Sequence, residues 1–397
     1  MINNKKVIVS ITSYPPRIFK IEKTLKCIFS QSVLPDKVVL YLVKSDFENI
    51  ELPKFLVKYY KKGLEIHWCE KNYKVHTKYF YAFQEYPNDL VITFDDDMVY
   101  ASTAIEELIQ GYRNYPEYII ARRAHYILLD DNNIIKPYNK WIWMGYGMEE
   151  TASHSLLATG VGGVLYQPCL LDKSVISSDE FLKISPINDD IWLKYVEIVS
   201  NMKVVLIQSS VLKDKVDIEE HKNGLQAINI GENMNDVQVK NVFYSPHAFS
   251  ACQENVLALL INEKKTFFET LINNLNAHIE KWLSIILKNS GDDVYIYGAG
   301  VIANRLKRII ASCNVPVKIK GFLVTSVENN PSEIDGIKVY ALDDFIEMKI
   351  PVIIGVSVSK QEEMFTLISS KFGQVKVYKL DTDILNTINL LDRIITK

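Results

Sequence analysis

The chain has 397 residues, of which 48% are hydrophobic and 23% charged, and its formal net charge is −3. This length and composition are typical of a globular protein of about two domains, and a charge so close to zero gives no general electrostatic reason to expect nucleic acid as a partner. The five cysteines include no CxxC pair and no run reaches about 18 apolar residues, so the sequence predicts no disulfide framework, thiolate zinc site or membrane span and favours a reduced, cytoplasmic protein without a signal peptide.

Strand-like and helix-like stretches alternate from the N-terminus, which predicts an α/β fold. The apolar stretch Val7–Ser13 is the first predicted strand, and apolar residues at helical spacing predict a helix over Ile18–Ser30. Further strands are predicted at Lys37–Val43, Leu64–Trp68 and Leu90–Phe94, with a short helix between His76 and Tyr86.

An acidic run, Asp95–Asp97, directly follows the strand Leu90–Phe94, which is apolar on both faces as a central parallel strand would be. Thr103 and Glu106 have the spacing of a capping box, so the run lies in the turn between a strand and a helix. Ligands bind at the carboxyl ends of strands in open α/β sheets, and adjacent carboxylates suit a cation such as Mg²⁺ or Mn²⁺. The alternative is a solvated acidic turn stabilised by the dipole of the following helix.

Six sequence blocks together resemble a group of bacterial capsule or surface-polysaccharide glycosyltransferases of the GT-A fold, family 2-like, and a seventh extends the resemblance to about residue 240. The resemblance implies transfer of a sugar from a nucleotide-diphosphate donor to a surface-glycan or lipid-linked acceptor. It identifies the aspartates as the DXD motif, in which Asp95 and Asp97 bind Mn²⁺ or Mg²⁺ while Asp95 and Asp96 contact the donor, with UDP-sugar as the commonest partner of such a site. The blocks are VSITSYPPRI (9–18), ITFDDDM (92–98), ARRAH (121–125), PYNKWIW (137–143), TGVGGVLYQP (159–168), INDDIWL (187–193) and GENMNDVQVKN (231–241).

The loop after the first strand contacts the nucleotide in a GT-A fold. Thr12, Ser13, Tyr14 and Arg17 are therefore candidates for holding the base and phosphates, Tyr14 by stacking and Arg17 by charge. The alternative is that Pro15–Pro16 only ends the strand and begins the helix, with proline in its first turn.

Three basic side chains precede or follow the acidic run. Lys78 lies where related folds place a basic residue near the donor diphosphate, although a solvated helix charge is the alternative. Arg122 and Arg123, with His125 close behind, would suit a phosphate or a charged acceptor. Because alternate residues of an extended segment point to opposite faces, one of the two arginines is expected to be structural.

A glycine-rich stretch, Thr159–Tyr166, lacks the Gly-Lys-Ser/Thr ending of a Walker loop. Because its glycines have no side chains, backbone amides could approach a sugar or phosphate closely. The resemblance makes this stretch an acceptor-side loop. The alternative is a tight turn at the start of a strand. Trp141, Trp143 and Tyr146 would form either a platform for a sugar ring or part of a core.

A second acidic pair, Asp189 and Asp190, follows Ser185 and Pro186, which have the character of an N-cap and a first helical residue. Inversion at an anomeric carbon needs a base that removes the acceptor hydroxyl proton, and an ionised aspartate serves this role. We expect one of the two to be that base and the other to be held by hydrogen bonds. Two surface aspartates that complement the helix dipole are the alternative.

Some GT-A enzymes complete the metal shell with a histidine from the end of the domain. His221 is the candidate for a metal ligand here, with His247 as the other choice. A solvated histidine is the alternative for either residue.

The sequence predicts three parts, a GT-A domain over 1–248, a helical connector over 249–290 and a Rossmann-like domain over 291–397. The connector contains no glycine or proline up to Ser290 and repeats apolar residues at helical spacing, which makes it a candidate homodimer surface. Its predicted apolar stripe comprises Phe268, Leu271, Leu275, Ile279, Trp282 and Ile286.

The C-terminal part carries a G-x-G-x-x-A fingerprint, Gly298–Ala303, between a predicted strand and a predicted helix. Thr325 and Ser326 stand where an acidic residue would be needed for NAD, so the turn is expected to be structural or to serve another nucleotide. The domain resembles Rossmann-like modules appended to other polysaccharide-biosynthesis proteins.

Two other functions are consistent with these patterns. A sugar nucleotidyltransferase shares the early α/β order and metal carboxylates but should carry a glycine-rich loop after its first strand, and ITSYPPRI has none. A non-catalytic sugar-nucleotide-binding or scaffold component of polysaccharide assembly is the other. A lipid-linked acceptor would bring the protein to the inner face of the membrane through a peripheral patch.

Overall fold

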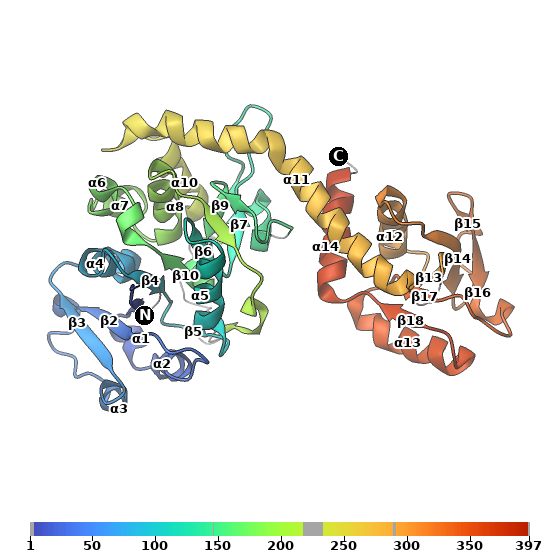
Figure 1. Cartoon of the computed structure of the whole chain (residues 1–397), viewed down its shortest axis with the longest axis horizontal. Coiled ribbons are helices and arrows are strands. Elements are labelled where there is room, and N and C mark those ends of the chain that lie inside the picture. Colours follow the sequence, from blue (N-terminus) through green and yellow to red (C-terminus); the bar gives the residue numbers. More distant parts are fainter. Residues whose placement is uncertain (1–3, 146, 217–232, 289–290, 396–397) are drawn as a thin grey trace. The chain divides into compact units, whose positions relative to one another are not determined.

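The computed structural model divides into two compact units, Met1–Thr266 and Phe267–Lys397. Each unit has its own sheet and its own covering helices (Figure 1). The structure describes all residues of the chain except 1–3, 146, 217–232, 289–290 and 396–397.

The N-terminal unit is built on a mixed eight-stranded sheet. β1 (Val7–Thr12) pairs in parallel with β2 (Lys37–Val43) on one side and with β4 (Leu90–Thr93) on the other. β10 (Val164–Tyr166) runs antiparallel between β4 and β6 (Ile119–Ala121). The order is β3-β2-β1-β4-β10-β6-β11-β8, with β3 at Leu64–Cys69, β11 at Val204–Leu206 and β8 at Ala152–Ser153. The predicted α/β fold class, with a parallel-rich GT-A-like sheet, is confirmed.

Helices cover both faces of this sheet. α2 (Glu22–Ile28) and α5 (Ala104–Asn114) share one hydrophobic core with β1, β2 and β4. On the other face, α4 (Thr77–Glu85) packs through Phe83 against Tyr166 of β10, with their ring centroids 5.2 Å apart. Every residue of β4 is buried, as expected for a central strand, although one of its two neighbours is antiparallel.

The helix predicted over Ile18–Ser30 is two helices. α1 (Pro15–Ile18) ends at Phe19, whose side chain is 56% exposed, and α2 begins only at Glu22. The apolar positions of the predicted stripe are still buried, because the turn between the helices keeps Ile18 and Ile21 directed into the core.

The predicted capping box at the start of α5 does not form. Thr103 is the N-cap, but its hydroxyl donates to the carboxylate of Glu107 at 2.6 Å and makes no cap hydrogen bond to the backbone. Glu106 instead accepts a hydrogen bond from Ser32 at 2.6 Å. Glu107 within the helix and Ser32 outside it therefore take the side chains of Thr103 and Glu106 away from the predicted motif.

Short elements complete the N-terminal unit. β5 pairs antiparallel with β12 immediately after the acidic run, and β7 pairs antiparallel with β9. These elements are α3 (Leu56–Tyr60), β5 (Met98–Val99), β7 (Ala124–Tyr126), β9 (Leu156–Ala158), α6 (Lys173–Ile176), α7 (Phe181–Ile184), α8 (Asp189–Val199), β12 (Lys215–Val216) and α10 (Met234–Phe243).

A single helix, α11 (Gln253–Leu287), occupies most of the predicted connector and contributes residues to both units. Its buried stripe is shifted from the predicted one: Phe268 is 42% exposed and Trp282 half-buried, while Phe267 and Leu283 are buried. The remaining predicted stripe residues are buried within the chain. Pairing of two copies through 249–290 stays a prediction.

The C-terminal unit has a six-stranded sheet in the order β15-β16-β14-β13-β17-β18. All neighbouring strands are parallel except β15 and β16, which gives the Rossmann-like order expected from the sequence. Its elements are β13 (Asp293–Tyr297), α12 (Val301–Ser312), β14 (Lys318–Val324), β15 (Glu333–Ile334), β16 (Ile337–Ala341), β17 (Val352–Ile354), α13 (Val358–Phe372), β18 (Val377–Lys379) and α14 (Thr382–Ile395).

The glycine turn after β13 has a structural reason. Gly298 has φ +113°, and a Cβ there would lie 3.0 Å from the carbonyl oxygen of Gly355. Thr325, at the end of β14, shares a hydrogen bond with the hydroxyl of Tyr297. Within the described ranges of the chain, no helix has both the length and the apolar character needed to cross a membrane.

Candidate functional site

The acidic run lies in a fixed turn at the carboxyl end of β4. The backbone amide of Asp95 donates to the hydroxyl of Tyr100 at 2.8 Å, and the ring of Tyr100 stacks on Phe94 with centroids 3.9 Å apart. Gly163 permits this stacking arrangement, because a Cβ at that position would lie 2.3 Å from the Phe94 ring. The turn is therefore held by aromatic packing and by the hydrogen bond to Tyr100.

The loop after β1 holds the middle aspartate. Asp96 accepts hydrogen bonds from Ser13 Oγ at 2.6 Å and from an Arg17 guanidinium nitrogen at 2.8 Å. Burial raises the pKa of Asp96, and Arg17 opposes that change. Thr12 donates its hydroxyl to the backbone oxygen of Tyr41 at 3.0 Å, whereas Tyr14 is 48% exposed. Of the four loop residues predicted to contact the donor, Ser13 and Arg17 thus bind directly to a side chain of the acidic run.

The outer two aspartates are more exposed than Asp96. The side chains of Asp95 and Asp97 are 27% and 20% exposed; Asp95 lies 2.5 Å from Lys78 Nζ and Asp97 lies 3.1 Å from Arg17. Burial and the neighbouring Asp95 raise the pKa of Asp97 to about 6.

A divalent cation fits this pair of carboxylates. No group of three histidine, cysteine or acidic side chains is gathered for a metal within the described part of the chain. Mg²⁺ in nucleotide sites is usually bound by one or two carboxylates together with substrate phosphates and water, so a complete protein cage is not required. Burial, followed by the charge of Asp95, raises the pKa of Asp97, and a cation bound between the two carboxylates would offset both effects.

Lys78 joins the two acidic regions of the sequence. Its Nζ lies 2.9 Å from Asp189 Oδ2 as well as 2.5 Å from Asp95 Oδ1, and the lysine side chain is 7% exposed. Burial alone would lower the pKa of Lys78, but Asp189 and Asp95 outweigh burial and raise it. Lys78 is therefore a buried cation between carboxylates rather than a solvated helix charge.

Gly160, in the glycine-rich stretch, completes this cluster. Its backbone amide donates to Asp190 Oδ1 at 2.9 Å. A Cβ on Gly160 would lie 3.1 Å from Lys78 Nζ and 3.3 Å from Asp190 Oδ1, so a side chain would enter the space between the two charges. The amide of Gly160 is thus bound to an aspartate, and the approach of this stretch to a sugar or phosphate stays a prediction.

The start of α8 positions the second acidic pair, but not through the predicted cap. Asn188 is the N-cap, and its side chain accepts a hydrogen bond from the amide of Ile191 at 3.0 Å. Ser185 instead ends α7 and donates to the backbone oxygen of Asn188 at 2.6 Å. The sequence prediction was wrong by one turn because α7 extends to the residue before Ser185.

The two aspartates of α8 have different surroundings. Asp189 is buried and paired with Lys78, whereas Asp190 is partly exposed. Burial, followed by the charge of Asp189, raises the pKa of Asp190 to about 8. Asp189 is thus held in an ion pair with Lys78, and Asp190 is held by the amide of Gly160.

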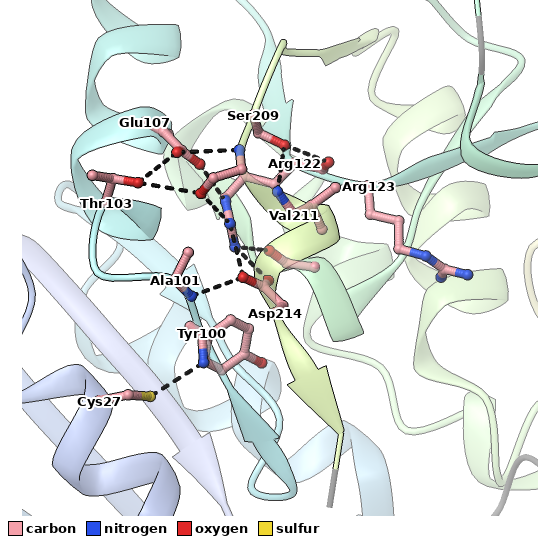
Figure 2. Close-up of polar contacts among 12 residues, drawn as sticks. Cys27, Tyr100, Ala101, Thr103, Glu107, Arg122, Arg123, Ser209, Val211 and Asp214 are labelled. Carbon is pink, nitrogen blue, oxygen red and sulfur yellow. Dashed lines mark hydrogen bonds and ion pairs between the residues drawn. The ribbon is translucent and has the colours of Figure 1, made fainter. Parts of the chain in front are cut away.

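The adjacent arginines point to opposite sides, as Figure 2 shows. Arg122 is fully buried and pairs with Glu107 and Asp214, each at 2.8 Å. Arg123 points away and donates to Thr159 Oγ1 at 2.9 Å. The structure makes Arg122 the structural member of the pair.

Glu107 and Asp214 were not singled out from the sequence. Asp214 also accepts a hydrogen bond from the amide of Ala101 at 2.8 Å, so the Arg122 network fixes the segment before β12 against the chain that follows the acidic run (Figure 2). Asp214 lies in LKDKVD, which has no feature to distinguish it from a solvated charge pattern.

The aromatic candidates separate into core and surface. Trp141 is buried and donates to the backbone oxygen of Lys136 at 2.8 Å, whereas Trp143 is 39% exposed and its ring centroid lies 4.7 Å from that of His125. His125 is buried and accepts a hydrogen bond from the amide of Met144 at 3.1 Å.

Of the two histidine candidates for a metal shell, His247 is the one that the structure describes. His221 and Tyr146 lie outside the described residues. Both ring nitrogens of His247 bond to backbone groups, Nε2 to the oxygen of Val242 at 2.9 Å and Nδ1 to the amide of Phe249 at 3.2 Å. His247 therefore belongs to a structural cluster.

No protein-family model matches the chain, and no curated protein matches it. Solved structures with a similar fold include Staphylococcus aureus TarS in complex with UDP-GlcNAc, at 14% identity and a TM-score of 0.37 over 69% of this chain and 81% of that chain. Another is the mannosyltransferase PcManGT from Pyrobaculum calidifontis in complex with GDP-Man and Mn²⁺, at 11% identity and a TM-score of 0.37 over 77% of this chain and 79% of that chain.

A synthase is also among the similar structures. The 4-diphosphocytidyl-2C-methyl-D-erythritol synthase from Anaerococcus prevotii has 14% identity and a TM-score of 0.35 over 54% of this chain and 94% of that chain. Similarity this weak concerns the fold alone and assigns no activity.

Proposed function

We propose that the N-terminal unit is a metal-dependent glycosyltransferase that moves a sugar from a nucleotide-diphosphate donor, with UDP-sugar preferred, to a surface-glycan or lipid-linked acceptor. The observation that supports this proposal is the convergence of two acidic regions on Lys78 at the carboxyl end of β4. Asp95 contacts this lysine from the acidic run, and Asp189 contacts it from α8. Ligands of open α/β sheets bind at this edge.

We assign Asp95 and Asp97 to the metal and the donor diphosphate. The metal, when bound, offsets the negative charge that develops on the leaving diphosphate. Arg17 orients Asp96 and Asp97, because its guanidinium group contacts both carboxylates. Lys78 fixes Asp95 from the other side.

We assign the catalytic base to Asp190 and the positioning role to Asp189. The amide of Gly160 holds one carboxylate oxygen of Asp190 and so fixes its orientation. The deprotonated carboxylate takes the acceptor hydroxyl proton as the hydroxyl oxygen attacks the anomeric carbon and the bond to the diphosphate breaks. Attack opposite the leaving group inverts the configuration.

The runner-up activity, nucleotidyl transfer, has less support. The loop after β1 contains no glycine to wrap a triphosphate, and its Ser13 and Arg17 are engaged with Asp96. A scaffold without catalysis would have no need for the Lys78 cluster, but it remains an outcome of the test below.

The test uses the full chain, Mn²⁺ and a panel of UDP-, GDP- and CDP-sugars, with release of free nucleoside diphosphate as the readout. One donor should be hydrolysed, EDTA should stop the reaction, and Asp97→Asn and Asp190→Asn should each lower the rate at least about 100-fold. Asp131→Asn, which removes an exposed carboxylate, should leave the rate unchanged.

Two results would refute the proposal. Release of pyrophosphate from a nucleoside triphosphate with a sugar phosphate would establish nucleotidyl transfer. No turnover of any donor, together with no metal-dependent nucleotide binding by calorimetry, would favour the scaffold.

A further inference from the structure

Arg123 is a largely enclosed cation with no carboxylate in contact within the described part of the chain. Its guanidinium group donates to two neutral acceptors, Thr159 Oγ1 at 2.9 Å and the sulfur of Met144 at 3.2 Å. Arg122, the preceding residue, has Glu107 and Asp214 as partners. Enclosing a charge without an opposite charge is costly unless a ligand supplies one.

The position of Arg123 links it to the base assigned above. Arg123 binds the side chain of Thr159, and the next residue, Gly160, donates its amide to Asp190. Tyr138 shares this space: burial raises the pKa of its hydroxyl, Asp190 raises it further, and Arg123 opposes both. Geometry links the phenol to the guanidinium group as well, because Arg123 contacts Met144 and the ring of the preceding residue, Trp143, lies beside that of Tyr138.

An exposed aromatic ring borders the same region. Trp143 is 39% exposed, and its ring centroid lies 5.9 Å from that of Tyr138. The next residue, Met144, has φ +63°, a left-handed conformation that costs about 1 kcal/mol for a residue with a side chain. This backbone turn accompanies the contact between Met144 sulfur and Arg123, and strain of this kind gathers at binding sites.

We propose that Arg123, Tyr138 and Trp143 form an acceptor subsite that binds a sugar bearing a phosphate or carboxylate group, an inference that rests on the proposed glycosyl transfer. The ring of Trp143 stacks on the acceptor sugar, Arg123 binds its anionic group, and Asp190 faces the hydroxyl that attacks. The anion belongs to the acceptor because the donor side already has Lys78 and Arg17 on the acidic run.

The experiment compares acceptors that differ only in charge. A neutral p-nitrophenyl glucoside, its 6-phosphate and the corresponding glucuronide are each offered to the full chain with the donor identified by hydrolysis. We expect kcat/KM for one charged acceptor to exceed that of the neutral one at least about 30-fold, and Arg123→Gln to bring this ratio toward one. Comparison of kcat/KM for the 6-phosphate and the glucuronide then shows which anionic group the subsite binds.

Matched variants separate this role from a structural one. Arg123→Lys keeps the charge and should retain part of the preference, and Lys140→Gln, which removes an exposed charge close in sequence to Tyr138, should keep the full ratio. An equal kcat/KM for charged and neutral acceptors in the wild type overturns the subsite. The subsite is also overturned if Arg123→Gln lowers kcat/KM by the same factor for charged and neutral acceptors.

The anion site can be tested even if the proposed glycosyl transfer is wrong. If no donor is hydrolysed, calorimetric titration of glucose 6-phosphate and glucuronate still tests the anion site directly. Binding that Arg123→Gln weakens at least about 10-fold would support the subsite without the transferase, and an absence of binding would refute the anion site as well.

Discussion

Lys78 is a buried counter-charge shared by the two acidic regions, since it contacts Asp95 and Asp189 while its side chain is 7% exposed. Removing a buried partner leaves uncompensated charge and costs about 3 to 5 kcal/mol. Lys78→Met should therefore lower the free energy of unfolding of the N-terminal unit by about 3 kcal/mol. Urea unfolding followed by tryptophan fluorescence measures this loss.

A double variant provides the control for that prediction. Lys78→Met combined with Asp189→Asn removes one of the two orphaned charges, so it should be more stable than Lys78→Met alone. Lys61→Met, at an exposed lysine, should change stability by less than about 0.5 kcal/mol. If Lys78→Met unfolds like Lys61→Met, the lysine is not an essential counter-charge.

The neighbouring arginines should differ sharply in their effect on stability. Arg122→Met breaks two ion pairs and a bond to Gly162 oxygen in a fully buried setting and should cost about 3 to 5 kcal/mol. Arg123→Gln loses contacts to neutral groups only and should cost less than about 1.5 kcal/mol. Thermal unfolding of both variants tests the contrast, and equal losses would contradict the division of roles.

At the scale of elements, α4 and α7 are joined by a histidine that must stay neutral. His76 donates from Nε2 to the backbone oxygen of Ser185 at 2.7 Å, and its Nδ1 lies 3.1 Å from the hydroxyl of Tyr79. Burial lowers the pKa of His76 to about 3 from its usual 6.5. Between those values the unfolded chain binds a proton that the folded chain does not, so stability falls as the pH drops below about 6.5.

His76→Gln tests this dependence, because the amide can keep the bond to Ser185. Between pH 6 and 4 the free energy of unfolding of the variant should fall less steeply than that of the wild type, by up to about 1.4 kcal/mol per pH unit. Burial also lowers the pKa of His125 to about 3. His125 therefore adds the same pH dependence to the wild type and to His76→Gln. A parallel shift of the curve in His76→Gln would contradict the assignment.

At the scale of the whole molecule, each unit has its own core, and the nucleotide is expected at only one of them. Calorimetry should therefore resolve two transitions. A nucleoside diphosphate with Mn²⁺ at about 100 times its Kd should stabilise the N-terminal one by about 2.7 kcal/mol.

Leu323→Ala identifies the other transition. Leu323 is fully buried in β14, so its truncation should cost about 2 to 5 kcal/mol in the C-terminal unit alone. If the nucleotide instead raised the unfolding temperature of the C-terminal unit, the binding site would lie at the Gly298 turn.

The sequence by itself determined the alternation of strands and helices, the place of Asp95–Asp97 after β4 and the place of Asp189 and Asp190 near the start of a helix. These features depend on apolar periodicity and on neighbours within a few positions, which a sequence displays directly. The Rossmann-like order of the C-terminal unit was foreseen for the same reason.

Only the tertiary structure decided which member of each adjacent pair, Arg122–Arg123 and Asp189–Asp190, is held in buried ion pairs. Arg122 is structural because Asp214, 92 positions away, supplies its charge, and Asp189 is buried because Lys78 reaches it from α4. The caps of α5 and α8 also differ from the predicted ones, because Thr103 donates to Glu107 and Asn188 caps α8 in place of Ser185. Ion pairs and hydrogen bonds act through space, and their strength depends on burial, so no local pattern in the chain specifies them.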